Sequence, residues 1–381
     1  MANEEGGSGF SPQGKRRVDL RWMRTALALA RRGLGGVWPN PAVGCVVVNE
    51  GRVVGRGWTQ PGGRPHAETE ALRRAGPAAR GATAYVSLEP CCHWGQTPPC
   101  ADALIAAGVR RVVVALEDPD LRVAGNGIGR LRAAGLAVEV GLGAEEAAEI
   151  NAGFLTRVSL GRPLVTLKLA TSLDGRIATC SGESQWITGP PARERGHALR
   201  AAHDAIMVGT GTMIADDPQL TCRLPGLGHR SPVRVFLDRL LHASPSSRMI
   251  ADARQTPTWV LTLRSGDPAR IQALLAAGVA VIEVGRDSEG RIDLAAALAA
   301  LGERGITRLL VEGGAGLAAT LLRARLVDRL AWLHAPLLIG GDGIPAIAAL
   351  GRDRLADAAR FKRLYMEPVG DDILTMFRAR A

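Results

Sequence analysis

The chain has 381 residues, of which 46% are hydrophobic and 22% charged, with a formal net charge of +10. This composition excludes a disordered protein, and the length exceeds one ordinary hydrophobic core, so two domains are expected. The positive residues, almost all arginines, form no basic stripe, and aromatic residues make up only 4% of the chain. Both facts argue against a nucleic-acid-binding surface. A solvated surface with high-GC codon usage explains the arginines best, and a phosphorylated small substrate is the next explanation.

The N-terminal residues 1–17 are polar and rich in glycine, which predicts a disordered tail. They lack the apolar stretch of a signal peptide, and no apolar run reaches the roughly 18 residues of a membrane span. We therefore expect a cytoplasmic protein that binds neither membrane nor nucleic acid.

Alternating helix and strand patterns over residues 18–161 predict a first α/β domain with a mainly parallel sheet. A Gly-rich stretch within it, residues 125–130, lacks a dinucleotide-binding fingerprint and is expected to be a plain loop. The predicted helices are 18–32, 66–75, 101–107 and 128–134, and the predicted strands are 43–48, 51–57, 84–88, 112–116 and 137–140.

A second α/β domain is predicted over residues 162–381, joined to the first by residues 150–162. It is expected to contain a helix at 193–202, and strands at 164–169, 205–208, 233–237, 259–263, 279–284 and 308–311. Residues 309–322 read as a strand, a Gly-rich turn and a helix, whose backbone N–H groups could hold a phosphate. A Gly-rich turn alone is weak evidence for such a site.

Three of the six cysteines fall within ten residues, at Cys91, Cys92 and Cys100. In a large chain without an export signal, clustered cysteines indicate a metal site before disulfides. His66 and Glu68 stand at the start of a predicted helix, an arrangement typical of zinc deaminases, in which the Glu is not a ligand. His66, Cys91 and Cys100 are therefore the predicted zinc ligands, and Glu68 the catalytic proton carrier.

The spacing of the two cysteine ligands departs from the usual P-C-x-x-C signature, because Cys91 and Cys100 lie nine residues apart. Cys92 is adjacent to Cys91, and neighbours rarely bind one ion together, so Cys92 is expected to be packed or free. Two alternatives stay open. One is a closed zinc knuckle that uses His66 or His93 with three cysteines, which leaves Glu68 unexplained, and the other is a set of inert thiols.

Several motifs resemble the bifunctional riboflavin-biosynthesis deaminase–reductase family, in which the long spacing between the two cysteines is usual. The matching segments are PNPAVGCVVV (39–48), PHAE (65–68), LEPCCHWGQTPPC (88–100), VAGNGI (123–128) and INAGF (150–154). The resemblance implies a cytidine-deaminase-like three-layer domain followed by a dihydrofolate-reductase-like α/β domain. It also implies one Zn²⁺ per chain, NADPH, and a homo-oligomer, either a dimer or a tetramer.

The activity implied by this resemblance is the deamination of a diaminopyrimidinone that carries a ribosylamino 5′-phosphate, followed by reduction of the ribose to ribityl. Asn40 and His93 would contact that substrate. At residue 59, seven positions before the zinc His, the family often has a histidine, whereas this chain has Thr59. A hydroxyl group thus replaces the imidazole that makes a substrate contact in the family.

The second half resembles the family's reductase domain in its motifs K-x-A-x-S-x-D-G (168–175), SQWIT (184–188), VGTGT (208–212), DDPQLTCR (216–223) and VEGG (311–314). By this resemblance NADPH would contact Ala170, Trp186, Thr212, Asp216 and the 314–320 loop, that is Gly314, Ala315, Gly316, Leu317, Ala318, Ala319 and Thr320. The substrate would contact Lys168, Ser184, Arg200, Leu220, Arg223 and Glu312. Arg200 and Arg223 have the chemistry of a phosphate clamp, and Lys168 or Glu312 could relay a proton.

Two functions of other classes remain as alternatives. A nucleic-acid deaminase would need a basic groove bearing aromatic residues. A zinc-stabilised binding protein would need four protein ligands and no open metal position.

Overall fold

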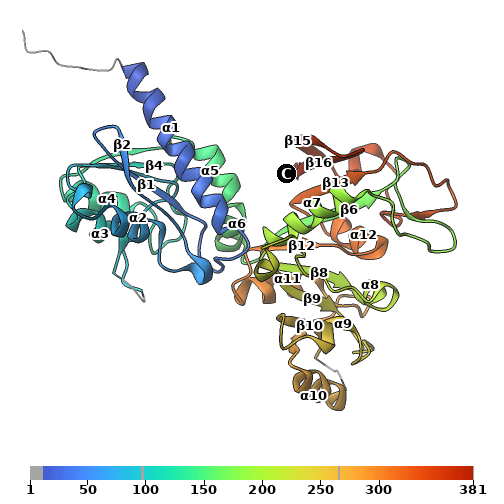
Figure 1. Cartoon of the computed structure of the whole chain (residues 1–381). Helices are drawn as coiled ribbons and strands as arrows, with labels where there is room; N and C mark the ends of the chain where they lie inside the picture. The colour runs from blue at the N-terminus through green and yellow to red at the C-terminus, as the bar shows by residue number, and fades with distance from the viewer. Residues whose placement is uncertain (1–11, 96–97, 265–266, 381) are drawn as a thin grey trace, which may run out of the picture. The chain divides into compact units, whose positions relative to one another are not determined.

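The chain divides between Ser159 and Leu160 into two units, each of which combines helices with a sheet (Figure 1). The computed structural model describes residues 12–95, 98–264 and 267–380. Within these ranges, no helix is both long and apolar enough to cross a membrane. Each unit has hydrophobic clusters of its own.

The first unit is built on a mixed sheet with the strand order β2-β1-β3-β4-β5. Strand β1 runs antiparallel to both β2 and β3, whereas β3, β4 and β5 are parallel. The expectation of a mainly parallel sheet is therefore wrong for this unit, because the N-terminal hairpin joins the sheet through a strand that opposes β3. The elements are α1 (Pro12–Ala30), β1 (Gly44–Asn49), β2 (Arg52–Trp58), α2 (Ala67–Ala75), β3 (Thr83–Val86), α3 (Cys100–Ala106), β4 (Arg111–Val114), α4 (Asn126–Ala133), β5 (Ala137–Val140), α5 (Ala144–Ile150) and α6 (Ala152–Leu160).

Helices cover both faces of this sheet. On one face, Met23 and Leu27 of α1 and Ala147 of α5 share a buried cluster with strand residues. On the other face, α2, α3 and α4 contribute Ala71, Leu104 and other apolar side chains to a second cluster. The predicted three-layer arrangement is thereby confirmed.

Two glycines of β2 let helix α2 lie directly against the strand. A Cβ atom at Gly55 would lie 2.2 Å from the carbonyl oxygen of Ala71, and one at Gly57 would lie 2.3 Å from that of Ala67. Residues two apart face the same side of a strand, so both glycines meet the same helix. This close packing fixes the first turn of α2, which bears His66 and Glu68.

Helix α1 begins at Pro12. The expected disordered tail of residues 1–17 is therefore wrong from residue 12 onward, because the helical pattern extends a further turn and a half toward the N-terminus. Lys15 within this extension forms an ion pair with Glu139 at 3.0 Å. The rest of the predicted tail, residues 1–11, lies outside the described residues.

The second unit contains a larger sheet with the order β11-β10-β9-β8-β12-β6-β13-β16-β15 among the described residues. The strands from β11 to β13 are parallel, and β16 and β15 add antiparallel pairs at one edge. The elements are β6 (Leu164–Thr171), β7 (Arg176–Ala178), α7 (Pro190–Ala201), β8 (Ala205–Gly209), α8 (Thr210–Asp216), β9 (Val233–Leu237), α9 (Arg248–Ala251), β10 (Thr258–Leu263), α10 (Pro268–Ala277), β11 (Ala280–Val284), α11 (Leu294–Glu303), β12 (Arg308–Val311), α12 (Ala315–Arg323), β13 (Arg329–His334), β14 (Ile344–Pro345), β15 (Phe361–Val369) and β16 (Asp372–Ala379).

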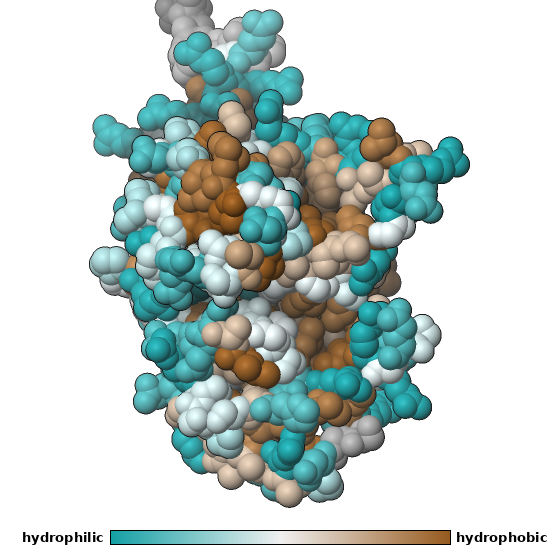
Figure 2. Space-filling view, turned by 90° about the vertical axis from the view of Figure 1, so that its right-hand side faces the viewer, coloured by the Kyte–Doolittle hydropathy of each residue, from teal (hydrophilic) through white to brown (hydrophobic). Residues whose placement is uncertain are grey.

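The central strands β8, β12 and β6 are parallel neighbours, so their carboxyl ends meet at one edge of the sheet. Strand β8 leads directly into α8, and β12 leads through Glu312 and two glycines into α12. Ligand sites in open α/β sheets form at such edges. The space-filling view shows hydrophobic residues in separate brown patches, some of them in hollows, between hydrophilic side chains (Figure 2).

Candidate active sites

The first candidate site is the meeting point of His66, Cys91 and Cys100. One potential ligand atom from each residue lies within 4.8 Å of the others. The Nδ1 atom of His66 is 3.7 Å from Sγ of Cys91 and 3.3 Å from Sγ of Cys100. The N-cap position of His66 on α2 and the start of α3 at Cys100 bring these side chains together. Cys92 is not part of the cluster, and its sulfur lies 3.6 Å from the carbonyl oxygen of Arg122.

The two thiols of the cluster differ in acidity. Hydrogen bonds from Cys100 and His66 lower the pKa of Cys91 to about 4. The same bond with Cys91, together with burial, raises the pKa of Cys100 well above its usual value. This environment favours the thiolate form of Cys91, and thiolates are the form that binds metal.

Glu68 lies in the first turn of α2 and is only 3% exposed. Burial raises its pKa to about 7, against the opposing effect of His66. It lines a cavity of about 540 Å³ together with His66 and Cys91. A carboxyl group that titrates near neutral pH beside a metal-binding cluster is suited to both accepting and donating a proton.

Asn40 and His93 line the same cavity. The side-chain amide of Asn40 donates to the carbonyl oxygen of Gly63 at 3.1 Å, and Gly63 must lack a side chain because a Cβ there would lie 1.9 Å from that amide. The Nδ1 atom of His93 is buried and has no hydrogen-bond partner among the described residues. An unsatisfied buried nitrogen in a cavity wall is a group that a ligand can satisfy.

Sequence reasoning missed other polar residues in this cavity. Asp118, Asp120 and Arg122 reach it from the segment after β4, and Arg157 reaches it from α6. Burial raises the pKa of Asp118 to about 6. For Asp118, Asp120 and Arg122, the position beyond the carboxyl end of the parallel strand β4 was the available signal, since such loops line ligand sites.

Thr59 is 2% exposed, and its hydroxyl group accepts from the N–H of Val43 at 3.0 Å and donates to the carbonyl oxygen of Pro41 at 3.0 Å. The hydroxyl thus holds the loop that carries Asn40. Thr59→Val keeps the shape but leaves both backbone groups unpaired, so the free energy of unfolding should fall by about 1–3 kcal/mol. Urea unfolding monitored on the first unit measures this, with Thr59→Ser as the control that keeps the hydroxyl. An unchanged midpoint in the valine variant would contradict it.

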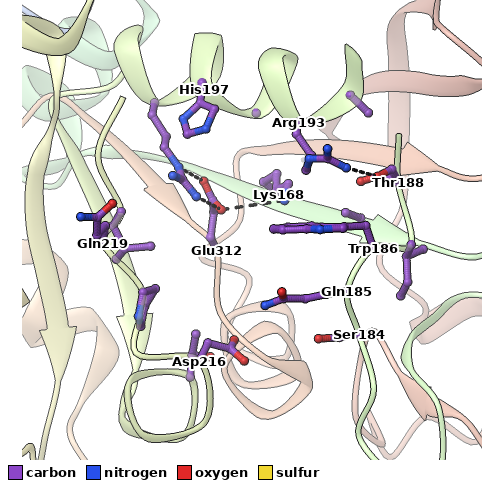
Figure 3. A pocket seen from close by; sticks show the side chains of 18 of the residues that line it. Lys168, Ser184, Gln185, Trp186, Thr188, Arg193, His197, Asp216, Gln219 and Glu312 are labelled. Carbon is purple, nitrogen blue, oxygen red and sulfur yellow. Dashed lines mark hydrogen bonds and ion pairs between the residues drawn. The ribbon is translucent and has the colours of Figure 1, made fainter. Parts of the chain in front are cut away.

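The second candidate site is a cavity of about 520 Å³ in the second unit. All six predicted substrate residues of this unit line it, namely Lys168, Ser184, Arg200, Leu220, Arg223 and Glu312. Four of the predicted cofactor residues also line it, namely Ala170, Trp186, Thr212 and Asp216. Figure 3 shows Trp186, Gln185 and Ser184 on one segment and Asp216 across the cavity from them.

A charge network lies in this cavity. Glu312 accepts from Nε and Nη2 of Arg200 at 2.8 and 2.9 Å, and Nζ of Lys168 is 3.8 Å from its carboxylate (Figure 3). Burial alone would raise the pKa of Glu312, but Arg200 and Lys168 outweigh it and lower that pKa to about 2. Glu312 is therefore ionised at neutral pH and holds two cations close together.

Sequence reasoning did not single out His197, Arg193 or Arg248, which also line the cavity. His197 lies on α7 one turn before Arg200, and its Nδ1 is 3.2 Å from the carbonyl oxygen of Thr221. Helical spacing of three residues was the signal that places His197 beside Arg200.

Residues 309–322 form the predicted strand, Gly-rich turn and helix, so the segment 314–320 is the start of a helix rather than a loop. Gly314 is the N-cap of α12, and residues 315–320 are its first turns. Ala318 and Ala319 are fully buried, and none of residues 314–320 lines the cavity. Gly314 lies close to Thr212, since a Cβ at Gly314 would be 3.7 Å from its Oγ1. The helix start is thus the part of this segment that adjoins the cavity.

The expectation of a plain loop at residues 125–130 is also wrong. Gly125 caps α4, which begins at Asn126. The N–H groups of Gly125 and Ile128 donate to the carboxylate of Glu89, beside the metal-binding cluster. A long-range partner thus orders a segment that sequence spacing alone leaves undefined.

Comparison with known proteins matches both halves of the chain. Residues 16–116 match the family model of the cytidine and deoxycytidylate deaminase zinc-binding region, and residues 163–375 match that of the RibD C-terminal domain. The riboflavin biosynthesis protein RibD of Escherichia coli K12 is 43% identical over 369 residues, covering 93% of this chain and 98% of that protein. The RibD protein of Bacillus amyloliquefaciens is 42% identical over 353 residues, covering 92% and 94%.

Solved structures are similar over 96% of this chain. The chain is similar to RibD of Acinetobacter baumannii, with a TM-score of 0.87 and 39% identity, over 96% of this chain and 100% of that one. A Thermotoga maritima structure is described as a diaminohydroxyphosphoribosylaminopyrimidine deaminase and 5-amino-6-(5-phosphoribosylamino)uracil reductase. Its TM-score is 0.83 and its sequence identity 34%, over 96% of this chain and 100% of that one. The predicted fold class, a cytidine-deaminase-like domain followed by a dihydrofolate-reductase-like domain, is confirmed.

Proposed function

Because this chain belongs to the RibD family, the bifunctional deaminase–reductases of riboflavin biosynthesis, we propose that its two sites act in turn on one phosphorylated aminopyrimidine. The chain is an enzyme with a deaminase and a reductase domain. The proposed substrate is 2,5-diamino-6-(5-phosphoribosylamino)pyrimidin-4(3H)-one, in keeping with the activity named for the Thermotoga maritima relative.

His66, Cys91 and Cys100 would hold one Zn²⁺. Imidazole and thiolate are ligands that zinc prefers, and three of them leave a fourth position for water. The spacing of the three ligand atoms, all within 4.8 Å, fits this donor set. A bound zinc lowers the pKa of its water to about 7, which makes the water a nucleophile at neutral pH.

Glu68 would move the protons of the deamination. Water adds to the ring carbon that bears the amino group, and Glu68 takes the proton that the water gives up. The carboxyl group passes this proton to the adjacent ring nitrogen. It then takes the proton of the added hydroxyl group and delivers it to the amino group, which leaves as ammonia while the carbon–oxygen double bond forms. The raised pKa of Glu68, about 7, suits a group that must accept and donate in one cycle.

The second cavity would bind the deaminated product with NADPH, which supplies a hydride to C1′ of the opened ribose. The nitrogen bonded to C1′ gains a proton when the hydride adds, and Lys168 is its proposed donor, because Glu312 is ionised and has none to give. Glu312 and Arg200 would hold Lys168 in place. Ala170, Trp186, Thr212, Asp216 and the start of α12 at Gly314 are the proposed contacts of NADPH.

The observation that carries this proposal is the cluster of His66, Cys91 and Cys100, together with the cavity that Glu68 lines beside His66 and Cys91. The test is to incubate the full chain with the diaminopyrimidinone phosphate and NADPH, and to measure ammonia and NADPH oxidation. A chelator should stop ammonia release but leave NADPH oxidation intact when the deaminated product is supplied directly. If the full chain neither releases ammonia nor oxidises NADPH, the proposal is refuted.

Arg223 is the proposed contact of the substrate phosphate in the reductase. It is exposed, lines the cavity, and its guanidinium group lies 3.4 Å from Thr221 Oγ1. Arg223→Ala should raise the reductase KM for the deaminated product about 10- to 100-fold, the loss of one charge-assisted hydrogen bond. Steady-state kinetics measure this, and deamination should be unchanged. Equal loss of both activities would contradict two separate sites.

A further inference from the structure

Glu89 is a buried carboxylate two residues before the zinc-ligand candidate Cys91. It is 4% exposed, yet its carboxylate partners are backbone N–H groups. One oxygen accepts from Asp118 at 3.2 Å and from Gly125 at 3.0 Å, and the other accepts from Ile128 at 3.0 Å. These bonds connect Glu89 to positions 29 to 39 residues further along the chain. Neither the proton transfer nor the metal binding described above uses Glu89.

The backbone of the partner segment is shaped to receive this carboxylate. Gly125 adopts a φ of +81°, in the left-handed region that favours glycine, and caps α4. At Gly127, a Cβ would lie 2.1 Å from the carbonyl oxygen of Pro90 and 3.1 Å from Oε1 of Glu89. Only glycine therefore lets α4 approach the backbone at Pro90, directly before Cys91. This explains the motif VAGNGI in physical terms.

We name residues 118–130 the clamp segment. Further contacts connect it to the residues next to Cys91 and Cys100. The sulfur of Cys92 lies 3.6 Å from the carbonyl oxygen of Arg122. Arg130 forms an ion pair at 2.5 Å with Asp102, on the helix that begins at Cys100. The clamp segment thus contacts the chain beside both cysteine ligands. It also supplies Asp118, Asp120 and Arg122 to the cavity wall.

We propose that Glu89 is a positioning residue of the deaminase, which fixes Cys91 and the cavity wall of the clamp segment in one rigid arrangement through its three N–H bonds. This inference rests on the proposed deaminase function for its kinetic part. Its structural part, the placement of Cys91, stands independently of that function. Groups outside the ligand set commonly orient the ligands of metal sites in this way.

Two substitutions break the arrangement from opposite sides. Glu89→Gln replaces one acceptor oxygen by an NH₂ group, which can only donate and would face a backbone N–H. Gly127→Ala leaves Glu89 intact but places a methyl group against the carbonyl oxygen of Pro90. The matched controls are Glu117→Gln, an exposed carboxylate of the neighbouring segment, and Gly129→Ala, which lies in the same helix where an added Cβ meets nothing within 4 Å.

The experiment uses the full chain loaded with Zn²⁺ or with Co²⁺, whose visible spectrum reports thiolate ligation. We expect both variants to keep wild-type reductase activity, to shift the Co²⁺ spectrum, and to lose about 10- to 100-fold in deaminase kcat per bound metal. Both controls should match the wild type in all three measurements. A folded Glu89→Gln chain with a wild-type spectrum and a wild-type kcat would overturn the proposal.

The proposed function and this inference fail in different ways. If the wild-type chain releases no ammonia, the deaminase assignment fails, whereas the Co²⁺ spectra still test the placement of Cys91. If the Gly127→Ala variant does not fold, the Glu89→Gln variant still tests the inference. Its intact reductase activity shows that the chain is folded, and its Co²⁺ spectrum and deaminase kcat are then compared with the wild type. A loss of kcat that also appears in the two controls would overturn the inference, because it would show a general sensitivity of the segment.

Discussion

Replacing Glu68 by glutamine should reduce deamination about 10²- to 10⁴-fold in kcat while the zinc content stays at the wild-type level. Glutamine has nearly the same shape but cannot accept and return a proton. The three ligand candidates His66, Cys91 and Cys100 are unchanged, so the variant should still bind zinc. Ammonia release and metal analysis on the same sample measure the two effects, and reductase activity on the deaminated product serves as an internal reference.

The matched control for this variant is Glu70→Gln, on the same helix turn. Glu70 is also buried, but it pairs with Arg73 and Arg74 at 2.8 and 2.7 Å and does not line the deaminase cavity. The Glu70→Gln variant should keep the full deaminase kcat, although it loses the ion pairs with Arg73 and Arg74. If Glu68→Gln loses its zinc, Glu68 supports the metal site rather than moving a proton, and the assigned role is wrong.

Local patterns in the sequence predicted the elements that surround the deaminase site. The helix that starts after His66 and the strand that ends before Glu89 follow from helix-cap and apolar-run signals, which depend on neighbouring residues. The metal-binding set could be named because residue types with few other uses recur at short spacing. These parts needed no knowledge of the tertiary structure.

The features that could not be predicted from the sequence depend on contacts between residues far apart along the chain. The bonds of Glu89 to Gly125 and Ile128 turn an apparently plain Gly-rich loop into a helix start. The pairing of Arg200 with Glu312 spans 112 residues. Spacing along the chain carries no information about such pairs.

The antiparallel edge of the second sheet was missed for a different reason. Strands β15 and β16 lack a strict alternation of buried and exposed residues, since β15 shows exposed pairs at Lys362–Arg363 and Tyr365–Met366. A bulge between Arg363 and Tyr365 shifts the register within that strand. A period-two pattern, which is the main sign of a strand, is therefore absent there.

The second large effect is expected from Glu312→Gln in the reductase. Glu312 is the anion that holds Lys168 and Arg200 together in the cavity. Without its charge the two cations repel each other, and Lys168 moves away from the position from which it would donate a proton. The reductase kcat should fall about 10²-fold, at the lower end of what a positioned proton donor contributes. Steady-state kinetics with the deaminated product measure the change.

A double-mutant cycle with Lys168→Met separates this role from a general loss of stability. If Glu312 acts by placing Lys168, then Glu312→Gln should cost little further kcat once Lys168 has been removed, because the two residues form one functional unit. Deamination by each variant should stay at the wild-type rate, since the first unit has its own site. If Glu312→Gln lowers kcat by the same factor in both backgrounds, the residues act independently, and Lys168 is not the proton donor that Glu312 positions.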